Sequence, residues 1–343
     1  MKKRLLSLLC LSLVVVMLLT SCGNTTPTET PTPTPTATVT ATPGIYLNGT
    51  MLDSTQLIVI DGVDVPFEEF RYYYLNLKYQ KDQGDNSYWE TQGAHSELLA
   101  EVEDYILSTY AVKALVKQYD VKLSDKYTKL LDDQIKAAVD ECGGEEEYVK
   151  ALADIYTTPE AYRELLELGY LQDSLFIDMF GDDIYADTIK NYYRAKHIMV
   201  SYDDEEDTSK EKNEEAYKLI TEVYSKLKDG GDFDTLMEEY CEDYGMVSFP
   251  DGYYFTTGDM PETFYNTVTA LKENETSEIF ETEHGYHIAL RLPLDEEYVR
   301  ENILTFMSMD IYYQIEDIIK TAQDNLKVAY SEAYNKLTYD SIK

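Results

Sequence analysis

Residues 282–292 read Thr-Glu-His-Gly-Tyr-His-Ile-Ala-Leu-Arg-Leu, and the run Tyr286–Leu292 within them is typical of a β-strand. A second run of this kind, Ala195–Val200, opens the section that this strand closes. Short runs at 253–255 and 279–280 predict two more strands between them. The section from Arg194 to Pro293 is therefore expected to contain a small sheet.

Helices are expected between these strands, because apolar residues recur there at helical spacing. One stripe lies at offsets 0, 3, 4, 7, 8 and 11 from Ala216 and ends before Gly230-Gly231. A second helix begins near Phe233, and Pro261 can open a third. The predicted order is β-α-α-β-α-β-β in about 100 residues, so the fold class is α+β and not a dinucleotide-binding fold.

The segments on either side are predicted to be helical after a short hairpin. Leu57–Val65 predicts the hairpin, with its turn at Asp61-Gly62, and Pro66 can begin a helix. Thr158-Pro159 starts a helix that is expected to end at Gly181. The remaining predicted helices lie at 93–118, 124–141, 145–155, 186–193, 296–319 and 321–338.

The first residues have the pattern of an export signal. Lys2, Lys3 and Arg4 precede the almost wholly apolar run Leu5–Leu19. The run ends in Leu19-Thr20-Ser21-Cys22, which resembles the bacterial lipobox, in which the cysteine receives a diacylglycerol and becomes the new N-terminus. We predict a lipoprotein signal at 1–21 and a lipid anchor on Cys22 at the extracytoplasmic face of the cell membrane. An uncleaved anchor helix with an incidental cysteine is the alternative.

Residues 22–44 are expected to form an extended linker, because Thr and Pro nearly alternate there. Cys142 and Cys241 are the two cysteines that lie outside the leader and the lipobox. Two distant thiols in an exported chain do not make a disulfide framework, so the core must hold the fold.

The chain is strongly acidic, with 65 Asp and Glu against 29 Lys and Arg and a formal charge of −36. Loss of the three basic residues of the leader would take this charge to −39. Nucleic acid is excluded as a partner, since phosphate recognition needs a basic face. Docking on an anionic lipid surface through protein charge is disfavoured for the same reason.

Four segments, in order and at matching spacing, resemble the parvulin-type (PpiC) peptidyl-prolyl cis–trans isomerase domain. They are Ala195–Val200 with His197, Gly231–Leu236 with Tyr240–Asp243, Gly258–Phe264 with Ala270–Lys272, and Thr282–Ile288 with His287. The flanks, notably Ile60-Asp61-Gly62 with residues 67–70, resemble the chaperone part of SurA/PrsA-type foldases.

With the lipobox, the chain is similar to PrsA-like foldase lipoproteins, a parvulin-like domain inserted between N- and C-terminal helical chaperone segments. The resemblance implies a helical N-terminal chaperone domain at 45–193 and an isomerase domain at 194–293. It also implies C-terminal helices at 294–343 that pack on the N-terminal domain.

The same resemblance implies an apolar slot for the proline ring, formed by Met260 and Phe264. Their spacing of four places both on one face of a helix. Relatives usually carry Gly-Asp-Leu-Gly-Trp/Phe before this helix, where the chain has Pro250-Asp251-Gly252-Tyr253-Tyr254-Phe255. We expect Phe255 to keep the aromatic role at the rim of the slot.

Four further residues are implied as catalytic. His197 and His287 map onto the paired histidines of the family, and Thr282 onto the residue that fixes a histidine tautomer. Asp243 maps onto a position near the isomerising carbonyl that relatives fill with Asp or Cys. We expect Asp243 to act through its charge and not as a nucleophile. No cofactor is implied.

Some of these residues have simpler explanations. A histidine on a strand, such as His197, can be a satisfied core residue, and Met260 can be a core residue too. His284 and His287 resemble a zinc pair, but no further Cys or His lies nearby, so we predict no metal. Cys241 lies on the apolar stripe of its helix, which favours packing over nucleophilic chemistry.

A phosphorylated substrate is not expected. Residues 203–215 contain eight acidic and two basic side chains, where phosphate-specific relatives carry a basic loop. This loop would repel a phosphopeptide.

Three functions are consistent with these features. The first is an active isomerase and foldase for unfolded or partly folded secreted proteins with Xaa-Pro bonds. The second is a chaperone with a vestigial isomerase domain, in which Tyr72–Tyr74 and others of the 32 tyrosines either contact clients or pack in the core. The third, a solute-binding lipoprotein, should show repeated βαβ units, which the sequence lacks. The oligomeric state is not fixed by the sequence, and a homodimer is compatible with the resemblance.

Overall fold

The computed structural model describes residues 42–202 and 213–343. The chain divides into two compact units, one containing the residues up to Met179 together with Met309–Lys343, the other Phe180–Ser308. The predicted leader, Cys22, most of the linker and most of the acidic loop lie outside the described residues. Within the ranges that are described, no helix combines the length and the apolar composition needed to cross a bilayer.

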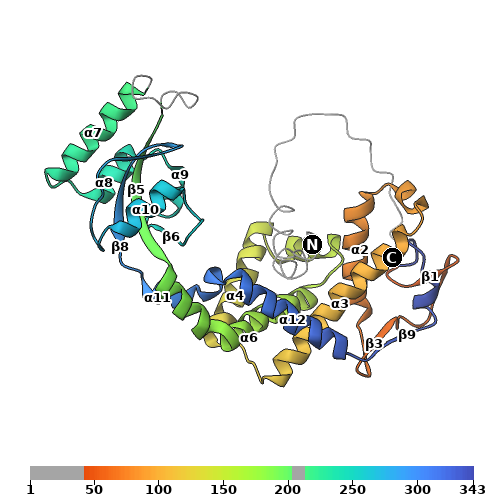
Figure 1. The fold of residues 1–343 in the computed structure, drawn as a ribbon. Helices are drawn as coiled ribbons and strands as arrows, with labels where there is room; N and C mark the ends of the chain where they lie inside the picture. Colours follow the sequence, from red (N-terminus) through yellow and green to blue (C-terminus); the bar gives the residue numbers. More distant parts are fainter. Residues whose placement is uncertain (1–41, 203–212) are drawn as a thin grey trace, which may run out of the picture. The chain divides into compact units, whose positions relative to one another are not determined.

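Helices form most of the first unit (Figure 1). They are α2 (Phe67–Asp82), α3 (Ala94–Gln118), α4 (Asp125–Cys142), α5 (Glu145–Asp154), the first part of α6 (Pro159–Asn191) and α12 (Met309–Asn325), with the 3-10 turns η1 (Asn86–Glu90) and η3 (Tyr334–Lys336). Their starts follow from local chemistry. The Thr158 hydroxyl accepts a hydrogen bond from the backbone N–H of Ala161, so the predicted cap of α6 is confirmed.

Two small antiparallel sheets complete this unit. Strands β1 (Tyr46–Leu47) and β2 (Thr50–Met51) form one, and the other has the order β4-β3-β9 from β3 (Ile58–Ile60), β4 (Val63–Asp64) and β9 (Val328–Tyr330). The predicted hairpin at Asp61-Gly62 is the β3–β4 turn, where both residues have positive φ. Figure 1 shows β9, near the end of the chain, beside β3, near its beginning.

The prediction of a helix at 321–338 is wrong. α12 ends at Asn325, and Val328–Tyr330 pairs with β3 instead. The apolar residues of this segment fit a helix in isolation. They also suit a strand, and the free edge of β3 decides between the two because it supplies the backbone hydrogen bonds. The helix expected at 296–319 is likewise divided, into α11 (Glu296–Glu301), η2 (Ile303–Phe306) and α12.

Helix α6 was expected to end at Gly181, with a separate helix at 186–193, but it continues without a break to Asn191. Gly181 is not among the residues with positive φ, so it does not form a left-handed cap. A glycine inside a helix costs only about 1 kcal/mol relative to alanine. Burial of Leu175 before it and Ile184 after it outweighs that cost.

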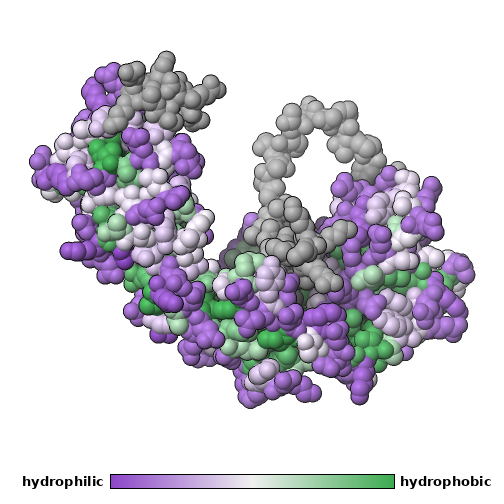
Figure 2. All heavy atoms as spheres, in the orientation of Figure 1, coloured by the Kyte–Doolittle hydropathy of each residue, from purple (hydrophilic) through white to green (hydrophobic). Residues whose placement is uncertain are grey.

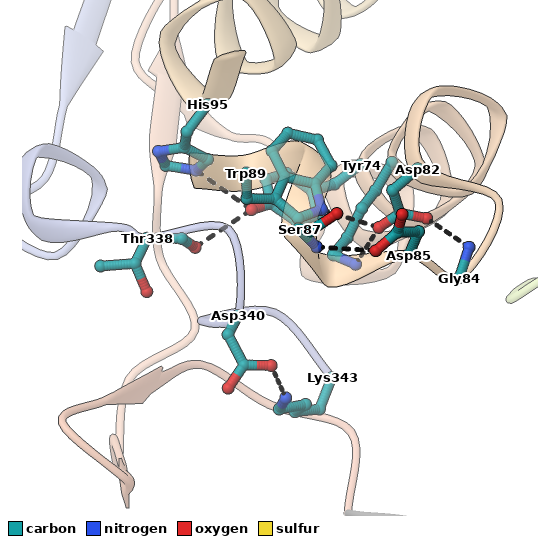
Figure 3. Close-up of polar contacts among 11 residues, drawn as sticks. Tyr74, Asp82, Gly84, Asp85, Ser87, Trp89, His95, Thr338, Asp340 and Lys343 are labelled. Carbon is teal, nitrogen blue, oxygen red and sulfur yellow. Dashed lines mark hydrogen bonds and ion pairs between the residues drawn. The ribbon is translucent and has the colours of Figure 1, made fainter. Parts of the chain in front are cut away.

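The Tyr72–Tyr74 run belongs to the core of the first unit. Tyr73 and Tyr74 are buried, and Tyr72 packs against the same cluster. The Tyr74 hydroxyl donates to the backbone carbonyl of Thr338 and contacts Nε2 of His95, at 3.1 Å in each case (Figure 3). These three of the 32 tyrosines therefore pack in the core, and the Tyr74 hydroxyl links the C-terminal segment to α2.

The second unit is the α+β domain. Its four-stranded antiparallel sheet has the order β6-β5-β8-β7, and all strand pairs in the described residues are antiparallel, so no βαβ unit is found there. The elements are β5 (Tyr193–Ser201), α7 (Glu214–Lys228), α8 (Phe233–Tyr240), α9 (Tyr244–Ser248), β6 (Tyr253–Phe255), α10 (Glu262–Ala270), β7 (Phe280–Thr282) and β8 (Gly285–Leu292). The predicted order is confirmed, with the short helix α9 added.

The two faces of this sheet carry different clusters. Ile198, Val200 and Ile288 pack with α7 and α8. Ala195, Ala289 and Phe255 pack with α10 on the other face. Outside these cores the surface is mostly hydrophilic, with smaller apolar areas on the face drawn in Figure 2. Strand alternation therefore decides which side chains reach the α10 face, where the candidate site lies.

Candidate active site

Both predicted histidines lie on the α10 face of the sheet. His197 on β5 is opposite Ala289, and His287 on β8 is opposite Met199. Residues two positions apart on paired antiparallel strands are diagonal neighbours on one face. The two rings are accordingly 5.3 Å apart between centroids and inclined by 36°. Both side chains are buried.

Thr282 fixes the orientation of His287. Its hydroxyl lies 2.7 Å from Nε2 of His287 and also accepts the backbone N–H of His284, at 3.1 Å. The hydroxyl therefore bridges the backbone of the β7–β8 turn and Nε2 of the imidazole, which holds the ring in one orientation. Phe280 stacks on the same ring at 5.3 Å.

His287 is held neutral. Burial, together with the nearby rings of His197 and His284, lowers the pKa of His287 to about 3. At neutral pH this ring is therefore an oriented, uncharged hydrogen-bonding group and not a source of protons.

Asp243 reaches the site along the free edge of β5. β6 pairs with β5 only as far as Ala195. Beyond that point the backbone N–H of Glu242 donates to the carbonyl of Met199, at 2.9 Å. The Cys241 thiol contacts the carbonyl of His197, at 3.4 Å. This segment places the Asp243 carboxylate beside the His197 ring, with Oδ2 and Nε2 2.7 Å apart.

Three donors surround the Asp243 carboxylate. Besides His197, the Tyr253 hydroxyl donates to Oδ2 and the backbone N–H of Gly245 donates to Oδ1, both at 2.8 Å. The hydrogen bond from His197 is the main cause that holds the pKa of Asp243 well below its usual range, against the opposite effect of burial. The group is an anion whose side chain is still 26% exposed, so a bound molecule can meet its charge.

The predicted apolar residues lie beside the histidines and differ in how far they are exposed. Phe264 is only 2% exposed and its ring meets His197 edge-on, with centroids 5.2 Å apart. Phe255 is fully buried and packs behind Phe264, at 5.7 Å, while Met260 is half-buried. Phe255 thus supports Phe264 from beneath, and Met260 is the member of the set with the most open position.

The structure links all seven predicted site residues through contacts with one another, and it adds Tyr253 and Gly245. Tyr253 lies in the segment that departs from the family pattern. It is two residues from Phe255 on a predicted strand, so both face the same side. This alternation is the feature of the sequence from which Tyr253 could have been predicted as a site residue. No feature of the sequence indicates Gly245, because Gly245 matters only through its closeness to Tyr253.

Two alternative sites can be assessed directly. Burial raises the pKa of the Cys241 thiol, which disfavours the reactive thiolate. His284 is exposed on the β7–β8 turn whereas His287 points inward, so the two do not converge on one ion. Over the described ranges, no three His, Cys, Asp or Glu side chains are grouped as a metal site would require.

Residues 197–291 match the family model of the rotamase or PPIC-type PPIase domain. The chain therefore contains a parvulin-type peptidyl-prolyl isomerase domain, and its position coincides with the site described above.

Similarity to foldases extends beyond this domain. The foldase protein PrsA of Bacillus subtilis (strain 168) is 28% identical over 177 residues, which cover 51% of this chain and 54% of that protein. PrsA of Oceanobacillus iheyensis is 25% identical over 248 residues, covering 70% and 74%. The chain thus spans about half of the length of the first of these relatives. A crystal structure of PrsA from Streptococcus pneumoniae aligns with 84% of this chain and all of that one, at 18% identity and a TM-score of 0.37.

Proposed function

We propose that this protein is a peptidyl-prolyl cis–trans isomerase and foldase that acts on secreted proteins outside the cell membrane. The single observation that carries the proposal is the assembly of the His197–Asp243 and Thr282–His287 pairs beside Phe264, inside the domain that matches the isomerase family. Its substrates would be unfolded or partly folded chains that contain Xaa-Pro bonds.

The reaction needs no covalent chemistry. Rotation about an Xaa-Pro bond passes through a twisted amide over a barrier of about 18–20 kcal/mol and takes tens of seconds or longer without a catalyst. A catalyst must hold the proline ring and favour the twisted state over the planar one. Met260, with Phe264 beneath it, supplies an apolar surface for the ring.

Asp243 supplies the electrostatic selection. Resonance in the planar amide places negative charge on the carbonyl oxygen, and this charge is lost as the bond twists. A fixed carboxylate near that oxygen therefore raises the energy of the planar state more than that of the twisted one. The three donors keep Asp243 ionised and in place, so the protein does not need to reorganise during rotation.

The histidines would support this arrangement. His197 orients Asp243 through Nε2, and His287 is fixed in turn by Thr282. We assign them positioning roles, because neither ring needs to exchange a proton for the amide to rotate.

We further propose that the protein is held at the extracytoplasmic face of the membrane by lipid on Cys22. The basic-apolar leader and the lipobox-like sequence support this, as does the similarity to foldases. The formal charge of −36 would keep the body of the protein away from anionic lipid headgroups, so the anchor would be the lipid alone.

A chaperone without isomerase activity is the second candidate. Exposed apolar side chains on the helices of the first unit and at the end of α3 favour it, and an unfolded client could contact them. They include Tyr79, Tyr119, Leu130 and Val149. The two candidates differ in one measurable property, the rate of cis–trans exchange.

The deciding experiment measures that rate by exchange NMR on an Xaa-Pro peptide with protein that lacks residues 1–22. We expect acceleration by the unmodified protein and its loss in a His197→Ala/Asp243→Ala double variant. His284→Ala serves as the matched control, because this exposed histidine lies on the β7–β8 turn of the same unit. An uncatalysed rate with the unmodified protein, together with suppression of client aggregation, would select the chaperone.

A further inference from the structure

The carboxylate of Asp243 has a second side-chain partner that the family pattern does not provide. Tyr253 lies at the start of the edge strand β6 and donates its hydroxyl to Oδ2 of Asp243, at 2.8 Å. That same oxygen accepts Nε2 of His197, at 2.7 Å. Tyr253 belongs to the 250–255 segment that replaces the usual Gly-Asp-Leu-Gly-Trp/Phe of relatives.

The surroundings fix the phenol in this role. Its ring meets His197 edge-on, with centroids 5.8 Å apart, and contacts Phe249 at 5.7 Å. Burial and the adjacent carboxylate raise the pKa of Tyr253, so the phenol stays protonated and its hydroxyl can only donate to the Asp243 anion.

Gly245 is shaped to admit this hydroxyl. A Cβ at Gly245 would lie 1.8 Å from the Tyr253 hydroxyl oxygen, far inside contact distance. The backbone N–H of the same residue donates to Oδ1 of Asp243. Absence of a side chain at 245 therefore allows both oxygens of the carboxylate to be held, Oδ2 by the Tyr253 hydroxyl and Oδ1 by the Gly245 N–H.

We propose that Tyr253 is a positioning residue of the isomerase site, which together with His197 fixes Oδ2 of Asp243, and that Gly245 provides the space it needs. With Oδ2 held by two donors and Oδ1 by the Gly245 N–H, the carboxylate cannot rotate when a substrate arrives. The charge then faces the amide in one orientation, which is what selection of the twisted state requires. This inference rests on the proposed isomerase function.

The test uses substitutions in the full chain that change one chemical group at a time. Tyr253→Phe removes the hydroxyl and keeps the ring. We expect kcat to fall roughly tenfold, the usual effect of one hydrogen bond to a charged group, with KM changed less than about twofold. Tyr254→Phe is the matched control, because the ring of this neighbour stacks on Tyr298, away from Asp243. It should leave both constants unchanged.

A double-mutant cycle separates positioning from packing. Gly245→Ala should reproduce the loss of kcat, because the new methyl group displaces the hydroxyl. In Tyr253→Phe/Gly245→Ala the clash with the hydroxyl oxygen is gone. The contacts that remain, 3.0 Å to Cζ of residue 253 and 3.1 Å to Oδ1 of Asp243, need only small shifts, so the combined loss should be close to that of Tyr253→Phe alone. Losses that multiply would overturn the proposal.

A spectroscopic readout makes the outcome independent of catalysis. The chain has four histidines, so ¹⁵N-histidine labelling gives a readable imidazole spectrum. When Tyr253 no longer shares Oδ2, the hydrogen bond from His197 should shorten and its Nε2 proton should move downfield. An unchanged His197 signal together with unchanged kcat in Tyr253→Phe would refute the role of Tyr253. An unmodified chain without isomerase activity but with this shift would refute the proposed function and leave the contact to Asp243 established.

Discussion

His197 and His287 lie on adjacent strands with their rings 5.3 Å apart, and each is held through Nε2 by a different partner. The ionised Asp243 carboxylate can only accept, so Nε2 of His197 donates to it, while Nε2 of His287 shares a hydrogen bond with the Thr282 hydroxyl. Within the described part of the chain these two Nδ1 atoms are buried and have no hydrogen-bond partner. Among the described residues, Nε2 therefore carries the hydrogen bonds of both rings.

Acid should destabilise the second unit through His287. Its pKa is lowered to about 3 in the folded protein, so the unfolded chain binds a proton more readily. Stability from this residue is complete above about pH 6.5 and declines as the pH falls toward 3. Between pH 7 and 4.5 the loss should be roughly 2–3 kcal/mol.

The measurement compares urea unfolding at these two pH values for the unmodified chain and for His287→Gln. Glutamine can still form a hydrogen bond with Thr282 but does not titrate, so the variant should lose less stability on acidification. His284→Gln, on the exposed turn, should behave like the unmodified chain. Equal pH dependence of all three would mean that His287 is not held neutral.

The charge of Asp243 should matter more than its shape. Asp243→Asn keeps the size of the side chain and removes the charge, and we expect kcat/KM to fall by roughly 10²-fold, as for other single groups that stabilise a transition state electrostatically. Exchange NMR on a proline peptide measures this directly. The contrasting variant is Asp234→Asn, on α8 and paired with Lys196. Full activity in Asp243→Asn would show that Asp243 acts through hydrogen bonding alone.

Met260 and Phe264 should separate binding from stability. Phe264 is almost fully buried, so Phe264→Ala should cost about 3–5 kcal/mol of unfolding free energy in the second unit. Met260 is only half-buried, and Met260→Ala should leave folding nearly intact but raise KM for a proline peptide. Thermal unfolding and steady-state exchange on the same samples provide both quantities. A large loss of stability in Met260→Ala would make it a core residue and not part of the slot.

Asp82 should control the stability of the first unit. It is buried and accepts from Lys78, Gly84 and Trp89, and Figure 3 shows its bond to Gly84. Burial alone would raise the pKa of Asp82, but these hydrogen bonds outweigh it and lower the pKa. Asp82→Ala should therefore cost about 2–4 kcal/mol.

Fluorescence of Trp89, the one tryptophan of the chain, reports on this unit, because its indole donates to Asp82 and stacks on Tyr339 at 5.8 Å. Asp85→Ala, which removes an exposed cap nearby, should cost no more than about 1 kcal/mol. Similar losses in both variants would contradict a special role for the buried carboxylate.

Local features of the fold could be predicted from the sequence. The β-α-α-β-α-β-β order, the Thr158 cap and the turn at Asp61-Gly62 each depend on neighbouring residues. Within the site, strand alternation places His197 and His287 on one face of the sheet.

Features of the fold that depend on distant parts of the chain could not be predicted from the sequence. The strand at Val328–Tyr330 exists because β3 offers an edge, and no property of that segment alone reveals its partner. Gly181 stays helical because of burial on both sides of it. Tyr253 joins Asp243 through the space left by Gly245, a three-dimensional coincidence that neither residue indicates on its own.

The pairing of β3 with β9 also affects the order in which the two units can fold during synthesis. The two strands are separated by roughly 270 residues, so a chain that emerges N-terminus first exposes β3 long before its partner exists. The sheet of the second unit needs only strands between Tyr193 and Leu292, all of which emerge earlier than β9. The inserted domain can therefore complete its fold first, while the unit that surrounds it in sequence stays open until the last residues arrive.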